Sequence, residues 1–182
     1  MEISKQELWV LSYYRASELA GALLFGRLAR RTEDDELRVF LTEHFAQEAS
    51  HAWVWTETIR NVGGAPLPIL DTYQSAYARE IGIPSTMFEV LLLTEVFEQR
   101  VFRHFTAHAA RKGLHPTVRA TLDRMLDEER EHVGWVTRML EALASESGID
   151  LPAERARYHA IDERIYDEVS GHEAALWEYL ES

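Results

Sequence analysis

Four long stretches with an apolar residue at every third or fourth position constrain the fold of this chain most. They cover residues 4–31, 34–61, 85–112 and 116–145. Each is about 26–30 residues long, so a helix over it would span roughly 40 Å at a rise of ~1.5 Å per residue. Helices this long in a chain of 182 residues predict an all-α four-helix bundle.

The links between the four predicted helices are short, long and short. The long link, residues 63–84, holds three of the five prolines. This order is typical of two antiparallel helix pairs joined by a crossover between the second and third helices. Residues 153–180 add a further helical pattern, broken at Ser170-Gly171. We therefore predict one domain over residues 1–182, comprising a bundle at about 4–146 and a C-terminal helical appendage at about 152–181.

The charge and the lack of cysteine exclude several classes of protein. The 31 acidic and 19 basic residues give a net charge of −12, which disfavours nucleic acid and anionic membranes as partners. Without cysteine there can be no disulfide, thiolate metal site or iron–sulfur cluster. No basic-then-apolar leader begins the chain, and no apolar run approaches the roughly 20 residues that span a bilayer. The expectation is a cytoplasmic protein.

The stretch "LDEEREHVGWV", residues 126–136, places charged groups where a helix should be buried. Glu129 and His132 are three residues apart and share one helix face with the apolar Val133 and Val136. A buried charge costs several kcal/mol unless it is paired or bound to a metal. Either this face is exposed to solvent, or a cation lies against it.

Each of the other predicted helices also carries acid on its apolar face. The second helix repeats the pair as Glu48 and His51, and the first and third offer Glu18 and Glu95. Four carboxylates contribute a charge of −4, which two divalent cations would cancel. One Glu from each of two helices and a Glu-x-x-His from each of the others is the ligand set of dinuclear carboxylate bundles. The predicted metal ligands are Glu18, Glu48, His51, Glu95, Glu129 and His132.

These motifs resemble the ferritin-like superfamily, nearest its bacterioferritin and rubrerythrin branch. "DEEREHVGWV" is similar to the fourth-helix motif of that branch, and "EASHAWVWTETIRNVGGAP" to its second helix and the turn that follows. The resemblance covers about residues 5–145 and implies the same six ligands, with Glu48 and Glu129 bridging the two ions. It also implies Glu98 as a possible additional ligand, of a kind typical of rubrerythrins.

Departures from this branch narrow the expected function. There is no cysteine for a rubredoxin iron, Ala49 stands where bacterioferritins have the haem methionine, and Phe25 replaces a tyrosine. The cofactor implied is two iron ions, or manganese or a mixed pair, without haem. We expect an oxidoreductase that activates O2 or peroxide, acts on a small organic substrate, draws on an external electron donor and has a homodimer as one possible assembly. The alternatives are a rubrerythrin-like peroxide reductase, a ferroxidase or iron-handling protein, and a metal-free interaction bundle.

The remaining histidines are given lesser roles. His44 lies one turn before Glu48 on the same face and is expected to support a ligand or fill the core. The others show no partner pattern and are expected at the surface: His104, His108, His115, His159 and His172.

Overall fold

Over the residues that the structure describes, all regular secondary structure is helical. A computed structural model describes residues 3–70, 72, 77, 84–168 and 170–182. The helices are α1 (Lys5–Ala29), α2 (Asp35–Asn61), α4 (Met87–Ala110), α5 (Pro116–Ser147), α6 (Leu151–Glu168) and α7 (Ser170–Glu181). The predicted all-α class and the four long helices are thereby confirmed. Half of the predicted crossover at 63–84 lies outside the described residues.

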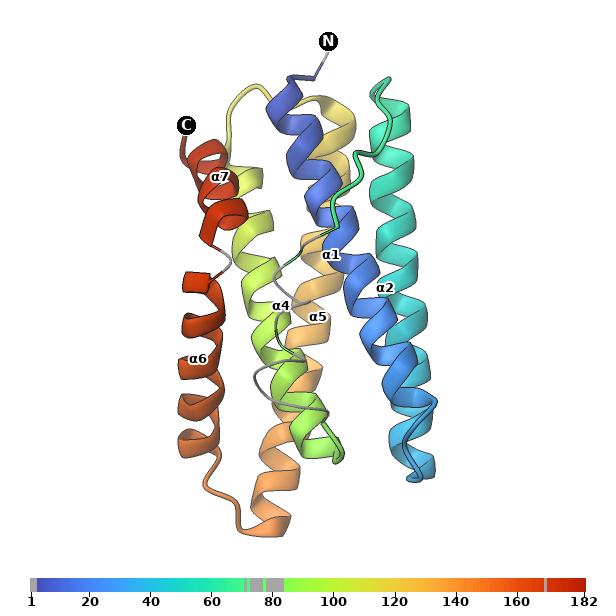
Figure 1. The fold of residues 1–182 in the computed structure, drawn as a ribbon, viewed down its shortest axis with the longest axis vertical. Coiled ribbons are helices and arrows are strands. Elements are labelled where there is room, and N and C mark those ends of the chain that lie inside the picture. The colour runs from blue at the N-terminus through green and yellow to red at the C-terminus, as the bar shows by residue number, and fades with distance from the viewer. Residues whose placement is uncertain (1–2, 71, 73–76, 78–83, 169) are drawn as a thin grey trace.

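Two helical hairpins form the body of the molecule (Figure 1). The first is α1 with α2 and the second is α4 with α5, and α2 also contacts α5. Both appended helices pack against α4, and α7 also touches α1 near the N-terminal end of the chain. The C-terminal segment is thus two helices, α6 and α7, and the break predicted at Ser170-Gly171 falls instead before Ser170, the first residue of α7. None of the described helices is long and apolar enough to cross a membrane.

Side chains at the helix ends satisfy backbone N–H groups that have no partner within the helix. Ser4 accepts a hydrogen bond from the Glu7 N–H at 3.0 Å, and Asp34 accepts one from the Leu37 N–H at 2.9 Å. The cap of α4 is Thr86, which forms a capping box with Glu89. The sequence had indicated Ser85, whose N–H and hydroxyl instead donate to the Glu89 carboxylate.

The apolar core is divided into two clusters by a polar layer. One cluster gathers Phe25, Phe40 and Leu140 with their neighbours, and the other gathers Trp55 and Leu122 with theirs. On each of the four bundle helices, the residues of one cluster precede the polar segment and those of the other follow it. A polar layer buried in this way must be internally satisfied, since unpaired polar groups are costly inside a protein.

Candidate metal centre

The polar layer consists of acidic and imidazole side chains contributed by all four bundle helices. All but one are buried, with His132 only slightly more accessible. The layer comprises Glu18 from α1, His44, Glu48 and His51 from α2, Glu98 from α4, and Glu129 and His132 from α5. The spacing of three residues in Glu-x-x-His brings both members of each pair to one helix face.

Glu18, His51 and Glu129 form the first of two groups that could hold a metal ion. The Nδ1 atom of His51 lies 3.7 Å from Glu18 Oε2 and 3.3 Å from Glu129 Oε1. One potential ligand atom from each residue lies within 4.8 Å of the other two. Since the three side chains come from three different helices, the bundle itself assembles this group.

Glu98, Glu129 and His132 form the second group. The Nδ1 atom of His132 lies 3.0 Å from Glu98 Oε1 and 4.0 Å from Glu129 Oε2. Glu129 therefore belongs to both groups, with Oε1 toward His51 and Oε2 toward His132. A carboxylate in this position can bridge two ions, one through each oxygen.

Glu48 lies beside these groups in a space left by a glycine. It is buried, and a Cβ atom added to Gly21 of α1 would lie only 2.6 Å from Glu48 Oε2. Burial raises the pKa of Glu48 well above its usual value, and the charges of Glu18 and Glu98 raise it further. The absence of a side chain at position 21 is thus what admits this carboxylate to the layer.

Replacing this glycine should damage metal binding more than stability. Gly21→Ala gains helix propensity of about 0.5–1 kcal/mol, but the new methyl group displaces the Glu48 carboxylate. We expect Mn(II) affinity to fall about tenfold or more, as when ligand-supporting groups are lost, measured from the EPR signal of free Mn(II). The matched control is Gly134→Ala on α5, where the nearest atom to the new Cβ is Arg138 Nη1 at 3.4 Å. Equal affinities in the two variants would contradict the placement of Glu48.

Glu95, one of the predicted ligands, lies apart from both groups in an ion pair. Arg155 of α6 donates from Nε to Glu95 Oε2 at 2.8 Å and from Nη2 to Oε1 at 2.6 Å. The Thr137 hydroxyl donates to Oε1 at 3.1 Å. The structure thus places Glu98, one turn later on α4, where the sequence had suggested Glu95.

The burial and the charges of the two groups favour the binding of protons or metal cations. Burial raises the pKa of Glu129 well above its usual value, and the charge of Glu98 adds to this. Burial alone would raise the pKa of Glu98 too, but the charge and hydrogen bond of His132 lower it to about 2. Burial alone would lower the pKa of His51 and His132, but the carboxylates facing them raise both. The layer therefore concentrates negative charge that a positive charge must balance.

Two buried atoms within the groups lack the hydrogen bonds that such atoms normally make. Neither His51 Nδ1 nor Glu129 Oε2 has a hydrogen-bond partner among the described residues. Both are atoms that bind metal ions, and both face the interior of the layer. A metal ion bound there would satisfy them, so the residues present fit a metal site.

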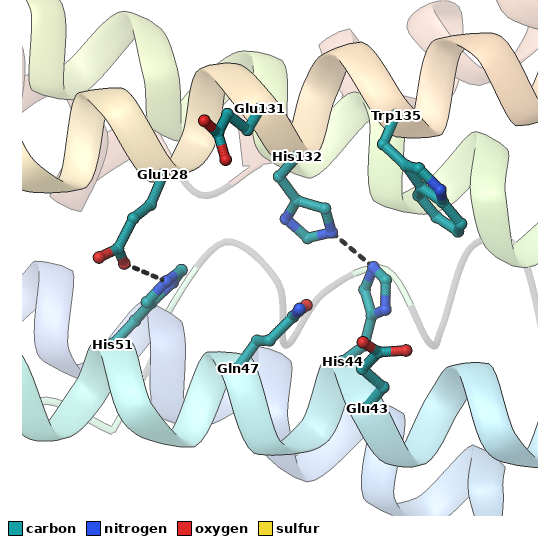
Figure 2. Close-up of a pocket in the computed structure, with 8 residues that line it drawn as sticks. All are labelled: Glu43, His44, Gln47, His51, Glu128, Glu131, His132 and Trp135. Atoms are coloured by element: carbon teal, nitrogen blue, oxygen red, sulfur yellow. Dashed lines mark hydrogen bonds and ion pairs between the residues drawn. The ribbon is translucent and has the colours of Figure 1, made fainter.

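The other ring nitrogen, Nε2, of His51 and of His132 contacts a neighbouring side chain. His51 Nε2 lies 3.2 Å from Glu128 Oε2, and His132 Nε2 lies 2.6 Å from His44 Nε2 (Figure 2). Burial and the neighbouring His132 lower the pKa of His44 to about 4, so that its ring is neutral and its Nε2 can accept a hydrogen bond from His132 Nε2–H. Such contacts fix the orientation of each ring and turn its Nδ1 toward the carboxylates of its group. His44 thus takes the supporting position that the sequence indicated.

Two histidines predicted at the surface are buried in the structure, so that prediction was wrong for them. His104 Nε2 lies 3.1 Å from Glu173 Oε2, and Tyr13 donates to the other oxygen of Glu173 at 2.7 Å. His108 is fully buried, with Nε2 3.8 Å from Glu7 Oε1. The reason is α7, which brings Glu173 against α4. The spacing of four between the two histidines, which puts them on one face, was the available signal.

A pocket of about 470 Å³ lies between α2 and α5, beside the Nε2 atoms of His51 and His132. Figure 2 shows side chains from both helices projecting into it from opposite sides. Its lining is Glu43, His44, Gln47, His51, Glu128, Glu131, His132 and Trp135. The pocket offers a route by which a small molecule can approach the polar layer from outside.

Comparisons with models of protein families, with curated proteins and with solved structures found no match. The chain is an all-α, bundle-like protein with buried glutamate and histidine groups that could hold metal.

Proposed function

We propose that the chain is a ferritin-like dinuclear metal oxidoreductase that activates O2 or peroxide. The two ions, iron or manganese or one of each, would be held by Glu18, Glu48, His51, Glu98, Glu129 and His132. The observation that carries the proposal is Glu129, whose two oxygens face two different groups of acid and imidazole. In this assignment Glu98 takes the place that the sequence had suggested for Glu95.

Charge balance supports this choice of ligands. The four carboxylates Glu18, Glu48, Glu98 and Glu129 carry −4, which two divalent ions neutralise. Glu95 is already neutralised by Arg155, so a fifth acid does not add to the site. Mixed oxygen and imidazole-nitrogen donors suit iron and manganese.

When bound, two such ions would supply one electron each for the reduction of O2 or peroxide. The chain's own residues orient and shield them. Glu128 and His44 hold the rings of His51 and His132 with Nδ1 toward the interior. The two apolar clusters lie on either side of the layer and limit the access of water. A small organic substrate would enter by the pocket between α2 and α5, and an external donor would return the electrons.

A peroxide reductase of the rubrerythrin kind is the second candidate. The position of Glu98 favours it, because the resemblance implies an acid there in rubrerythrins and the structure puts this one against His132. A ferroxidase is the third, and it would require iron to pass on into a hollow assembly or to a partner.

Aerobic titration with Fe(II) separates these candidates. For an oxidoreductase we expect oxidation and uptake to stop near two ions per chain, with the protein remaining a small particle by light scattering. Glu129→Ala should abolish this saturable uptake, because both groups lose a ligand. Glu146→Ala, an exposed acid on the same helix, should leave it unchanged. Continued uptake with mineral growth in a large hollow particle would overturn the enzyme proposal, and the oxidant consumed tells O2 from peroxide chemistry.

A further inference from the structure

The pocket between α2 and α5 has the size of a site for an organic molecule. Its volume is about 470 Å³, within the ~300–1,000 Å³ common for small-molecule sites. A metal ion with six waters needs only about 180 Å³, at about 30 Å³ per water. The pocket is therefore much larger than the passage of a hydrated ion requires.

The charge of the lining is negative. Glu43 comes from α2, while Glu128 and Glu131 come from α5, and none of the lysines or arginines that the structure describes lines the pocket. Arg124 bonds Glu128 from outside the lining at 2.7 Å. Among the described residues no cation forms an ion pair with Glu43 or Glu131. Two carboxylates thus remain for a positively charged ligand.

An aromatic surface bounds the same pocket. Trp135 lines it and is 36% exposed, and its indole ring stacks on Phe40 with centroids 5.4 Å apart. An indole ring held in place by such packing can take an apolar group or a cation against its free surface. The three glutamates would repel an anionic ligand, and a neutral ligand would lack the electrostatic attraction to their carboxylates.

We propose that this pocket binds a small organic ammonium ion, a primary amine with an aromatic or alkyl body. The ammonium group lies beside Glu131, and the body lies against Trp135, four residues further along α5. If the proposed function holds, such an amine is the class of substrate brought to the metal centre, since His51 and His132 belong to both. The binding step itself needs no metal.

Calorimetry on the full-length, metal-free protein at low salt tests the proposal with three probes of similar shape. They are 2-phenylethylammonium, neutral 2-phenylethanol and anionic 3-phenylpropionate. We expect the ammonium ion to bind about tenfold more tightly than the alcohol and the anion not to bind. Glu131→Gln should weaken ammonium binding about threefold and Trp135→Leu about fivefold. Glu146→Gln makes the same charge change elsewhere on α5 and should have no effect.

Equal affinities for the three probes, or an ammonium affinity unaffected by both pocket variants, would overturn the proposal. Both variants change exposed side chains, and unaltered circular dichroism establishes that they fold. Displacement of the ammonium ion by Mn(II) in Glu129→Ala would also overturn it, because the pocket would then be a cation-entry site. Fe(II) titration tests the metal centre separately. Amine binding without metal uptake would leave the pocket proposal intact and contradict the proposed function.

Discussion

Mn(II), added anaerobically to the metal-free protein until the free ion is at about 1,000 times its Kd, is expected to raise the melting temperature by about 10 °C. Only the folded chain brings Glu18, His51 and Glu129 to one place, so the ions bind the folded state alone. Free metal at about 1,000 times the Kd stabilises by about 4 kcal/mol. In a domain of this size, each kcal/mol shifts the melting temperature by about 2–4 °C. Thermal unfolding followed by circular dichroism measures the shift, and a chelator should reverse it.

Matched variants show whether the effect arises in the polar layer. The double variant Glu48→Ala/Glu129→Ala should lose the response to Mn(II) and to the chelator. Glu57→Ala/Glu146→Ala removes two exposed acids from the same two helices and should keep the full response. An unchanged melting curve after verified metal loading of the wild type would count against a buried site.

Removal of Arg155 should destabilise the fold far more than removal of a neighbouring arginine. Arg155→Gln leaves the Glu95 carboxylate, whose side chain is 3% exposed, without its ionic partner. Breaking a buried pair in this way costs roughly 3 kcal/mol. Arg157→Gln breaks a solvent-exposed pair with Glu154 on the same helix and should cost less than about 1 kcal/mol. Urea unfolding measures both.

The partner acid provides the further control. Arg155→Gln combined with Glu95→Gln should recover much of the lost stability, because two neutral amides replace an unpaired charge. If Arg155→Gln were no more harmful than Arg157→Gln, the ion pair would not be what holds α6 against α4. Glu95 would then again be available as a metal ligand.

Local patterns were sufficient to predict the bundle helices and most of the polar layer. Helical periodicity and capping residues depend on neighbours within a few positions. The predicted bounds of the bundle helices therefore agree with the observed ones to within a few residues. The three-residue spacing likewise fixes Glu48 with His51 and Glu129 with His132 on one face each.

The choice between Glu95 and Glu98 depended on a contact that no local pattern encodes. Both acids lie on one side of α4, one turn apart. Arg155, which takes Glu95 out of the layer, lies 60 residues further along the chain. The burial of His104 by Glu173 has the same origin, since α7 returns to α4 from the end of the chain. Long-range packing of the two C-terminal helices is what the sequence alone did not reveal.

Anomalous scattering from crystals of the Mn(II)-loaded protein shows whether the polar layer holds two ions. We predict two manganese peaks inside the bundle, one between Glu18, His51 and Glu129 and one between Glu98, Glu129 and His132, with Glu95 still bound to Arg155. A single peak, or peaks only at exposed carboxylates with the layer unoccupied, would contradict it.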